Sequence, residues 1–134
     1  MIKRLAHVCI HTTNLTKTEH FYCQALGLKK QFEFVRNDKP FGFYLRLGNH
    51  SFIEVFAGDP GEVGNINHLA LEVTSIDEIA QTLKAHGYEI SEKKMGGDHS
   101  WQAWTADPSG IRIELHEYTA QSMQLTGGVC HVDW

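Results

Sequence analysis

The chain repeats itself at an interval of about 60 residues, and this repeat constrains the fold more than any other feature of the sequence. A glutamate interrupts an apolar run at Glu54, in Phe-Ile-Glu-Val-Phe, and again at Glu114, in Arg-Ile-Glu-Leu-His. A histidine opens an apolar run at His7 and again at His68. Two copies of one small module, each with a histidine at the start of its first strand and a glutamate in its last, explain this spacing.

Both halves predict the same order of elements, a strand, a helix and then three strands. Asn14 and Ser75 are good helix N-caps, and Gly27 and Gly87 stand where the two helices end. In the first half the expected strands cover residues 4–12, 28–36, 41–47 and 51–56, and the helix covers 15–26. In the second half the strands cover residues 66–74, 88–93, 101–106 and 111–117, and the helix runs from 76 to about 86.

We therefore predict a single α+β domain built from two βαβββ modules. Module 1 covers about residues 4–57, module 2 about 65–117, and a tail follows at 118–134, where 129–134 could form one more strand. A module of this size is too small to bury a sheet alone, so the pair is expected to form an eight-stranded mixed surface with the helices outside.

Composition excludes several classes of function. The net charge is −4 and no basic block occurs, which argues against nucleic-acid binding. No apolar run is long enough to span a membrane or to serve as a signal peptide, so no membrane partner is expected. Three cysteines without a CxxC pair indicate a reducing compartment, the cytoplasm.

The two histidines and two glutamates together predict a metal site. An ionised carboxylate in apolar surroundings is unfavourable by several kcal/mol unless it is paired or metal-bound. Any one of the four residues could be an ordinary polar residue on a strand that faces a solvent-filled cleft. Four of them at one shared interval favour a common metal site formed by His7, Glu54, His68 and Glu114. Such a set suits one divalent ion, Zn, Ni or Co first and Mn or Fe next, with positions left for water or substrate.

The alternation of side chains along a strand predicts further residues of the metal site. Residues i and i+2 of a strand share a face, so four further polar side chains should line the same cavity. They are His11, Glu72, Arg112 and His116.

These motifs resemble the vicinal oxygen chelate superfamily, which includes glyoxalase I, extradiol dioxygenases and fosfomycin-resistance transferases. The resemblance covers about residues 4–117 and is carried by Phe21-Tyr22, Leu-Gly-Leu and the Asp-Pro-Ser-Gly-Ile-Arg-Ile-Glu-Leu run that begins at Asp107. It implies an open cup formed by the paired modules, a metal in the cup, and a homodimer whose sites are shared between subunits.

The glyoxalase I arrangement implies the ligand set His7, Glu54, His68 and Glu114. The dioxygenases and fosfomycin transferases have a three-ligand set, with no carboxylate at the position of Glu54. The glutamate at this position therefore makes the chain more similar to glyoxalase I. Two residues that help to hold glutathione in that enzyme would fall at His11 and Gly58, where this chain differs.

The resulting hypothesis is a metal-dependent lyase or isomerase acting on a small α-hydroxycarbonyl-type substrate, such as lactoylglutathione, through a metal-chelated enediolate, with Glu54 or Glu114 as the base. The alternatives are an Fe(II) extradiol-type dioxygenase, a fosfomycin-type thiol transferase, and a non-catalytic ligand-binding module. The glycine-containing loop 94–100 is either a lid or a plain hairpin connection. Cys9 is expected to be a small core residue.

Overall fold

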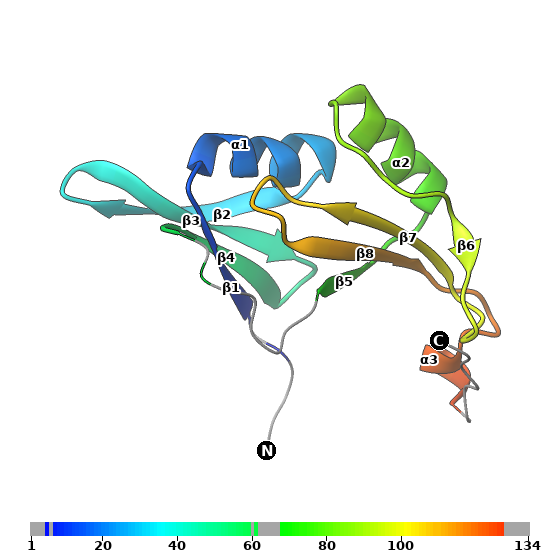
Figure 1. Cartoon of the computed structure of the whole chain (residues 1–134). Coiled ribbons are helices and arrows are strands. Elements are labelled where there is room, and N and C mark those ends of the chain that lie inside the picture. The colour runs from blue at the N-terminus through cyan, green and yellow to red at the C-terminus, as the bar shows by residue number, and fades with distance from the viewer. Residues whose placement is uncertain (1–4, 6, 60, 62–67, 128–134) are drawn as a thin grey trace, which may run out of the picture. The chain divides into compact units, whose positions relative to one another are not determined.

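The structure is a computed structural model and describes residues 5, 7–59, 61 and 68–127. It contains two compact units, Met1–Ile66 with Asp107–Gly110, and Asn67–Ala106 with Ile111–Trp134. Each unit holds one four-stranded mixed sheet (Figure 1), which confirms the α+β class and the two βαβββ modules. The possible strand at 129–134 and most of the linker lie outside the described residues. None of the helices in the described ranges has the length and apolar character needed to cross a membrane.

The first unit follows the predicted order closely. Its elements are β1 (His7–Thr12), α1 (Leu15–Glu19), the π-helix η1 (His20–Ala25), β2 (Lys29–Arg36), β3 (Lys39–Leu47) and β4 (Ser51–Ala57). The strands lie in the order β1-β4-β3-β2, with β1 parallel to β4 and the other pairs antiparallel. The turn before β3 is tighter than predicted, because Asn37 and Asp38 both take left-handed φ angles of 53° and 57°.

The first helix changes type part-way along, which the sequence did not predict. Asn14 caps α1 as expected, with its Oδ1 accepting a hydrogen bond of 2.9 Å from the Lys17 amide. From His20 the helix widens, and the Leu26 amide bonds to the carbonyl of Phe21, five residues earlier. The wider turn lets the adjacent side chains of Phe21 and Tyr22 both be buried.

The second unit repeats the topology. Its elements are β5 (Leu69–Glu72), α2 (Ile76–Ala85), β6 (Lys94–Met95), β7 (Trp101–Ala106), β8 (Arg112–Glu117) and the short α3 (Met123–Thr126). The strands lie in the order β5-β8-β7-β6, with β5 parallel to β8. Ser75 caps α2 as predicted, with its Oγ accepting a hydrogen bond of 3.3 Å from the Glu78 amide.

One predicted strand is wrong. Residues 88–93 are not a strand, and the fourth strand of the second sheet is β6, inside the segment expected to be a loop. Residues 88–93 still run alongside β7, but side-chain hydrogen bonds replace part of the backbone pairing. The Ser91 hydroxyl accepts from the Trp104 amide at 2.9 Å, and Thr105 Oγ1 donates to the Glu89 carbonyl at 2.7 Å. These hydroxyls fill positions that a regular ladder would give to backbone groups.

The turn between β7 and β8 belongs to the first unit, although the sequence places it in module 2. The Tyr22 hydroxyl donates to Asp107 Oδ2 at 3.1 Å, and Ser109 Oγ donates to Thr12 Oγ1 at 2.8 Å. Both bonds join residues more than 80 positions apart, and they hold the 107–110 turn within the first unit.

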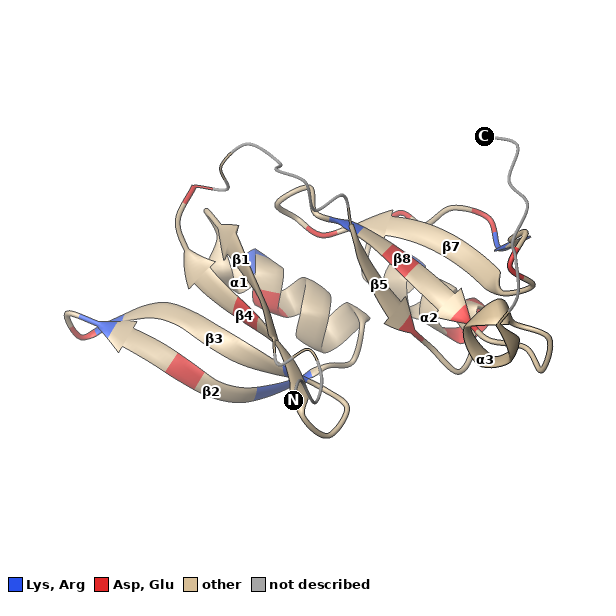
Figure 2. Cartoon of the chain, turned by 90° about the horizontal axis from the view of Figure 1, so that it is seen from below, with Lys and Arg blue, Asp and Glu red and all other residues tan. Residues whose placement is uncertain are grey.

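Alternation along the central strands separates a core face from a polar face in each unit. Ile53 and Val55 are buried on either side of Glu54 in β4, and both neighbours of Glu114 in β8 are likewise buried. Figure 2 shows acidic residues within β4 and β8. Each glutamate therefore lies on the face opposite to its apolar neighbours, as the apolar-run pattern predicted.

Candidate functional site: two histidine–glutamate pairs

The first unit brings His7 and Glu54 together. His7 Nε2 lies 3.7 Å from Glu54 Oε2, across the parallel pair β1 and β4. The Tyr44 hydroxyl lies 3.0 Å from His7 Nδ1, the other nitrogen of the ring. This contact orients the imidazole so that Nε2 faces the carboxylate.

The second unit brings His68 and Glu114 together in the same way. His68 Nε2 lies 3.3 Å from Glu114 Oε2. Trp104 occupies the position equivalent to Tyr44 and contacts the His68 ring edge to face, with the centroids 4.9 Å apart. The strand registers match as well, since Glu54 pairs with Cys9 and Glu114 with Ala70, each two residues after the histidine.

The geometry of both pairs fits two donors of one cation. Ligand atoms at about 2.1 Å from a metal and roughly 90–110° apart are separated by about 3.0–3.4 Å. The observed separations of 3.7 and 3.3 Å are close to this range, and imidazole with carboxylate is a suitable donor set for Zn, Ni, Co, Mn or Fe. Within the described ranges no three His, Cys, Asp or Glu side chains are grouped closely enough to hold a metal ion.

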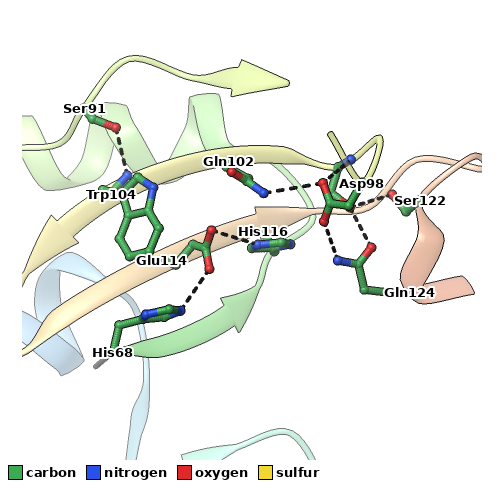
Figure 3. A network of polar contacts seen from close by, with 10 residues as sticks. His68, Ser91, Asp98, Gln102, Trp104, Glu114, His116, Ser122 and Gln124 are labelled. Carbon is green, nitrogen blue, oxygen red and sulfur yellow. Dashed lines mark hydrogen bonds and ion pairs between the residues drawn. The ribbon is translucent and has the colours of Figure 1, made fainter. Parts of the chain in front are cut away.

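Glu114 has a second imidazole beside it. His116 Nε2 lies 3.0 Å from Glu114 Oε1, so the two carboxylate oxygens face two different histidines (Figure 3). Glu114 and His116 are each 8% exposed. His116 Nδ1 is buried and has no hydrogen-bond partner in the described part of the chain. Sequence reasoning placed His116 in the cavity but did not predict its contact with Glu114.

Cys9 is a correction to the sequence analysis. It is exposed rather than part of the core, because it shares the outward face of β1 with His7. Desolvation, and then the hydrogen bond and charge of Glu54, raise the pKa of the Cys9 thiol to about 11. The thiol is therefore protonated near neutral pH and is not an activated nucleophile.

The other predicted cavity residues lie on the expected strand faces. His11 and Glu72 are exposed near the ends of β1 and β5, and His11 lies near Gly58. The Arg112 guanidinium lies 4.6 Å above the Trp104 ring.

The segment 94–100 is hydrogen-bonded to α3. Asp98 accepts a hydrogen bond from Gln124 of α3 and another, of 3.2 Å, from the Ser100 amide (Figure 3 shows the Gln124 contact). Desolvation opposes ionisation of Asp98, but these hydrogen bonds and the nearby His116 outweigh it and lower its pKa. The bonds favour a fixed connection over a lid for this segment.

An aromatic surface surrounds Glu54 and was missed by the sequence analysis. Phe32 stacks on Tyr44 with centroids 4.5 Å apart, and Phe34 contacts Phe56 at 4.7 Å. Phe52 completes the group beside Tyr44 at 5.4 Å. All five occupy alternate positions on the glutamate-bearing face of β2, β3 and β4, and Phe32 is 45% exposed. The period-2 placement of these rings in three strands is the sequence signal that could have predicted the surface.

Comparison with known proteins identifies the family. Residues 4–115 match the Glyoxalase/Bleomycin resistance protein/Dioxygenase superfamily. The chain belongs to this superfamily. This glyoxalase-superfamily chain is 26% identical over 126 residues to the uncharacterized protein YaeR of Escherichia coli (strain K12), covering 87% of this chain and 97% of YaeR.

Two further relatives show the breadth of the superfamily. Metapyrocatechase of Geobacillus stearothermophilus is 26% identical over 120 residues, and the match covers 85% of this chain but 37% of that protein. A variant of the fosfomycin resistance protein FosX from Listeria monocytogenes, solved with Mn(II) and 1S,2S-dihydroxypropylphosphonic acid, has the same fold. Its TM-score is 0.73 at 22% identity, covering 92% of this chain and 98% of FosX.

Proposed function

We propose that the protein is a metal-dependent lyase or isomerase of the glyoxalase type, which moves a proton between adjacent carbons of a small α-hydroxycarbonyl-type substrate. The observation that supports this most is the repeated pair, His7 with Glu54 and His68 with Glu114, at 3.7 and 3.3 Å on matching strand registers. Four such donors would hold one divalent cation, with Zn, Ni or Co preferred. FosX, solved with Mn(II), supports a divalent ion in this fold.

The chemistry follows from the donor set. A divalent cation chelated by adjacent substrate oxygens lowers the pKa of the neighbouring C–H bond and stabilises the negative charge that develops there. A carboxylate from Glu54 or Glu114 then takes the proton from one carbon and returns it to the next. The aromatic rings beside Glu54 would favour an apolar group on the substrate.

Proton exchange tests the proposal directly. The protein is loaded with Zn, Ni or Co and incubated in D₂O with a panel of α-hydroxyketones and with the hemithioacetal of methylglyoxal and glutathione. We expect deuterium at the α-carbon by NMR, and loss of this exchange in Glu54→Gln with the fold intact. The matched control is Glu92→Gln, on an exposed loop residue, which should exchange at the wild-type rate. Full exchange by Glu54→Gln would refute the role of the pair.

A homodimer with sites shared between subunits is part of the proposal. Mixed subunits test it. If a site takes Glu54 from one subunit and Glu114 from the other, an equal mixture of refolded Glu54→Gln and Glu114→Gln subunits should recover about a quarter of wild-type activity. Sites contained within one subunit would give none. The free thiols of Cys9 and Cys23 suit a reducing cytoplasm as the location.

An Fe(II) dioxygenase is the second candidate. The aromatic surface beside Glu54 could stack a catechol ring, and metapyrocatechase is among the relatives. Purified protein that carries iron and consumes oxygen with catechols would support this reading over the lyase. Protein that carries Zn, Ni or Co and consumes no oxygen would exclude it.

A further inference from the structure

The two modules support their histidine–glutamate pairs differently. In the second unit His116 contacts Glu114 directly, with Nε2 and Oε1 3.0 Å apart. The position equivalent to His116 in the first unit is Phe56, two residues after Glu54 just as His116 follows Glu114. Phenylalanine cannot donate a hydrogen bond, so the two modules differ in how this position can support the glutamate.

The contacts of Glu54 are correspondingly weaker. Among the described residues it meets His7 at 3.7 Å, beyond hydrogen-bond distance, and accepts from the Cys9 thiol, which is a weak donor. Its side chain is 17% exposed, against 10% for Glu114. Glu114 thus has an imidazole nitrogen within 3.3 Å of each oxygen, while Glu54 has one imidazole at 3.7 Å and the weak Cys9 donor.

His116 is buried, and one of its two ring nitrogens has no hydrogen-bond partner in the described residues. The ring is packed against Tyr118, with centroids 5.8 Å apart, and faces Gln102 across the β7–β8 ladder. With Nε2 donating to Glu114, Nδ1 is left buried without a partner in the described residues, which is unfavourable by about 1–3 kcal/mol. A buried unsatisfied nitrogen of this kind calls for a functional explanation.

We infer that His116 is a positioning residue: it holds Glu114 with Oε2 directed at His68, so that Glu114 would serve as a fixed metal ligand and Glu54 would be the carboxylate that transfers the proton. This inference rests on the proposed function. Groups that hydrogen-bond to metal ligands fix ligand orientation, and their removal typically weakens metal affinity by about 10–100-fold.

Metal affinity provides the test, with Co(II) as the probe and a competing chelator as the reference. The variants are His116→Phe, which makes the second unit resemble the first, and His116→Gln, whose amide can still donate. We expect His116→Phe to weaken Co(II) binding by about 10–100-fold and His116→Gln to recover most of the loss. Unchanged affinity in a folded His116→Phe would overturn the inference.

A second comparison does not depend on the folding of the His116 variants. Glu114→Gln should lose more Co(II) affinity than Glu54→Gln, because the fixed ligand contributes more than the mobile one. Equal losses, or the reverse order, would contradict the division of roles. Long-range ¹H–¹⁵N NMR of the metal-free protein should also find the proton of His116 on Nε2, and a proton on Nδ1 alone would exclude donation to Glu114.

The failures of the two proposals are distinguishable. Wild-type protein that binds no divalent metal would remove the proposed function together with the inference. Wild-type protein that binds Co(II) tightly and exchanges substrate protons, with no effect of His116→Phe on either, would remove the inference alone.

Discussion

The buried hydrogen bond between Tyr22 and Asp107 should be a major contributor to stability. Tyr22 has no exposed surface, Asp107 is 5% exposed, and the hydroxyl donates to Oδ2 at 3.1 Å. Desolvation, and then the charge and hydrogen bond of Asp107, raise the pKa of Tyr22 well above its usual value, so the hydroxyl is protonated and able to donate at any pH near neutrality. The substitution Tyr22→Phe removes this donor and leaves the ring packing intact.

The expected magnitude follows from the charge of the acceptor. Hydrogen bonds to charged groups contribute about 1.5–3 kcal/mol, and a buried carboxylate that loses one keeps its desolvation penalty. With a urea dependence of about 1–3 kcal/mol per molar, the unfolding midpoint should fall by roughly 1 M. The edge-to-face contact of Tyr22 with Phe21, at 5.0 Å between centroids, should persist in the variant.

Urea unfolding at pH 7, followed by circular dichroism, measures the effect. Tyr118→Phe is the matched control, because the Tyr118 hydroxyl makes no hydrogen bond among the described residues, and it should change the free energy of unfolding by less than about 0.5 kcal/mol. A midpoint for Tyr22→Phe equal to that of the control would refute the argument that this bond fastens the 107–110 turn to the first unit.

Two further predictions concern pH and close packing. Glu117 accepts hydrogen bonds from the Ile76 amide at 2.8 Å and from Lys93 at 2.9 Å, and the Ile76 bond is the main cause of its lowered pKa. Because the pKa of Glu117 in the folded protein lies below the unfolded value of 4.5, this stabilisation is present above that pH and is lost as the pH falls further. The substitution Glu117→Gln should lower the free energy of unfolding by about 1–2 kcal/mol at pH 7. In a plot of urea midpoint against pH, the variant should also show a smaller fall on the acid side than the wild type. A Cβ on Gly42 would lie 2.2 Å from the Val55 carbonyl oxygen, so Gly42→Ala should lower stability by about 1–3 kcal/mol in thermal unfolding, whereas Gly61→Ala, with open space around it, should be nearly neutral.

The sequence predicted those features of the fold that depend on local pattern. The caps at Asn14 and Ser75 and the alternation around Glu54 and Glu114 involve residues close together in the chain, and the repeat copies these local patterns 60 residues later; each is confirmed. The approach of His7 to Glu54 was also predictable, because a parallel strand pair brings same-face residues of the two strands together.

The features that sequence reasoning missed depend on contacts between distant residues. The Tyr22–Asp107 bond moves a turn of the second module into the first unit, although both motifs were noted separately. Ser91 replaces a backbone partner of Trp104 and so prevents a regular strand over residues 88–93. Glu117 caps the helix of its own unit from a strand 41 residues away, which no local capping pattern could indicate.

The paired modules explain how a symmetric set of donors can act asymmetrically. Duplication produces two equivalent histidines and two equivalent glutamates, but the proposed proton transfer would need one carboxylate to move while the other three donors hold the cation. Changes beside the donors can provide this difference without altering any donor: Tyr44 orients His7 in one unit, and His116 restrains Glu114 in the other. The substitution Phe56→His would restore the symmetry by giving Glu54 a similar restraint. If mobility of Glu54 is required for proton transfer, that variant should bind Co(II) at least as tightly as the wild type and yet exchange substrate protons more slowly.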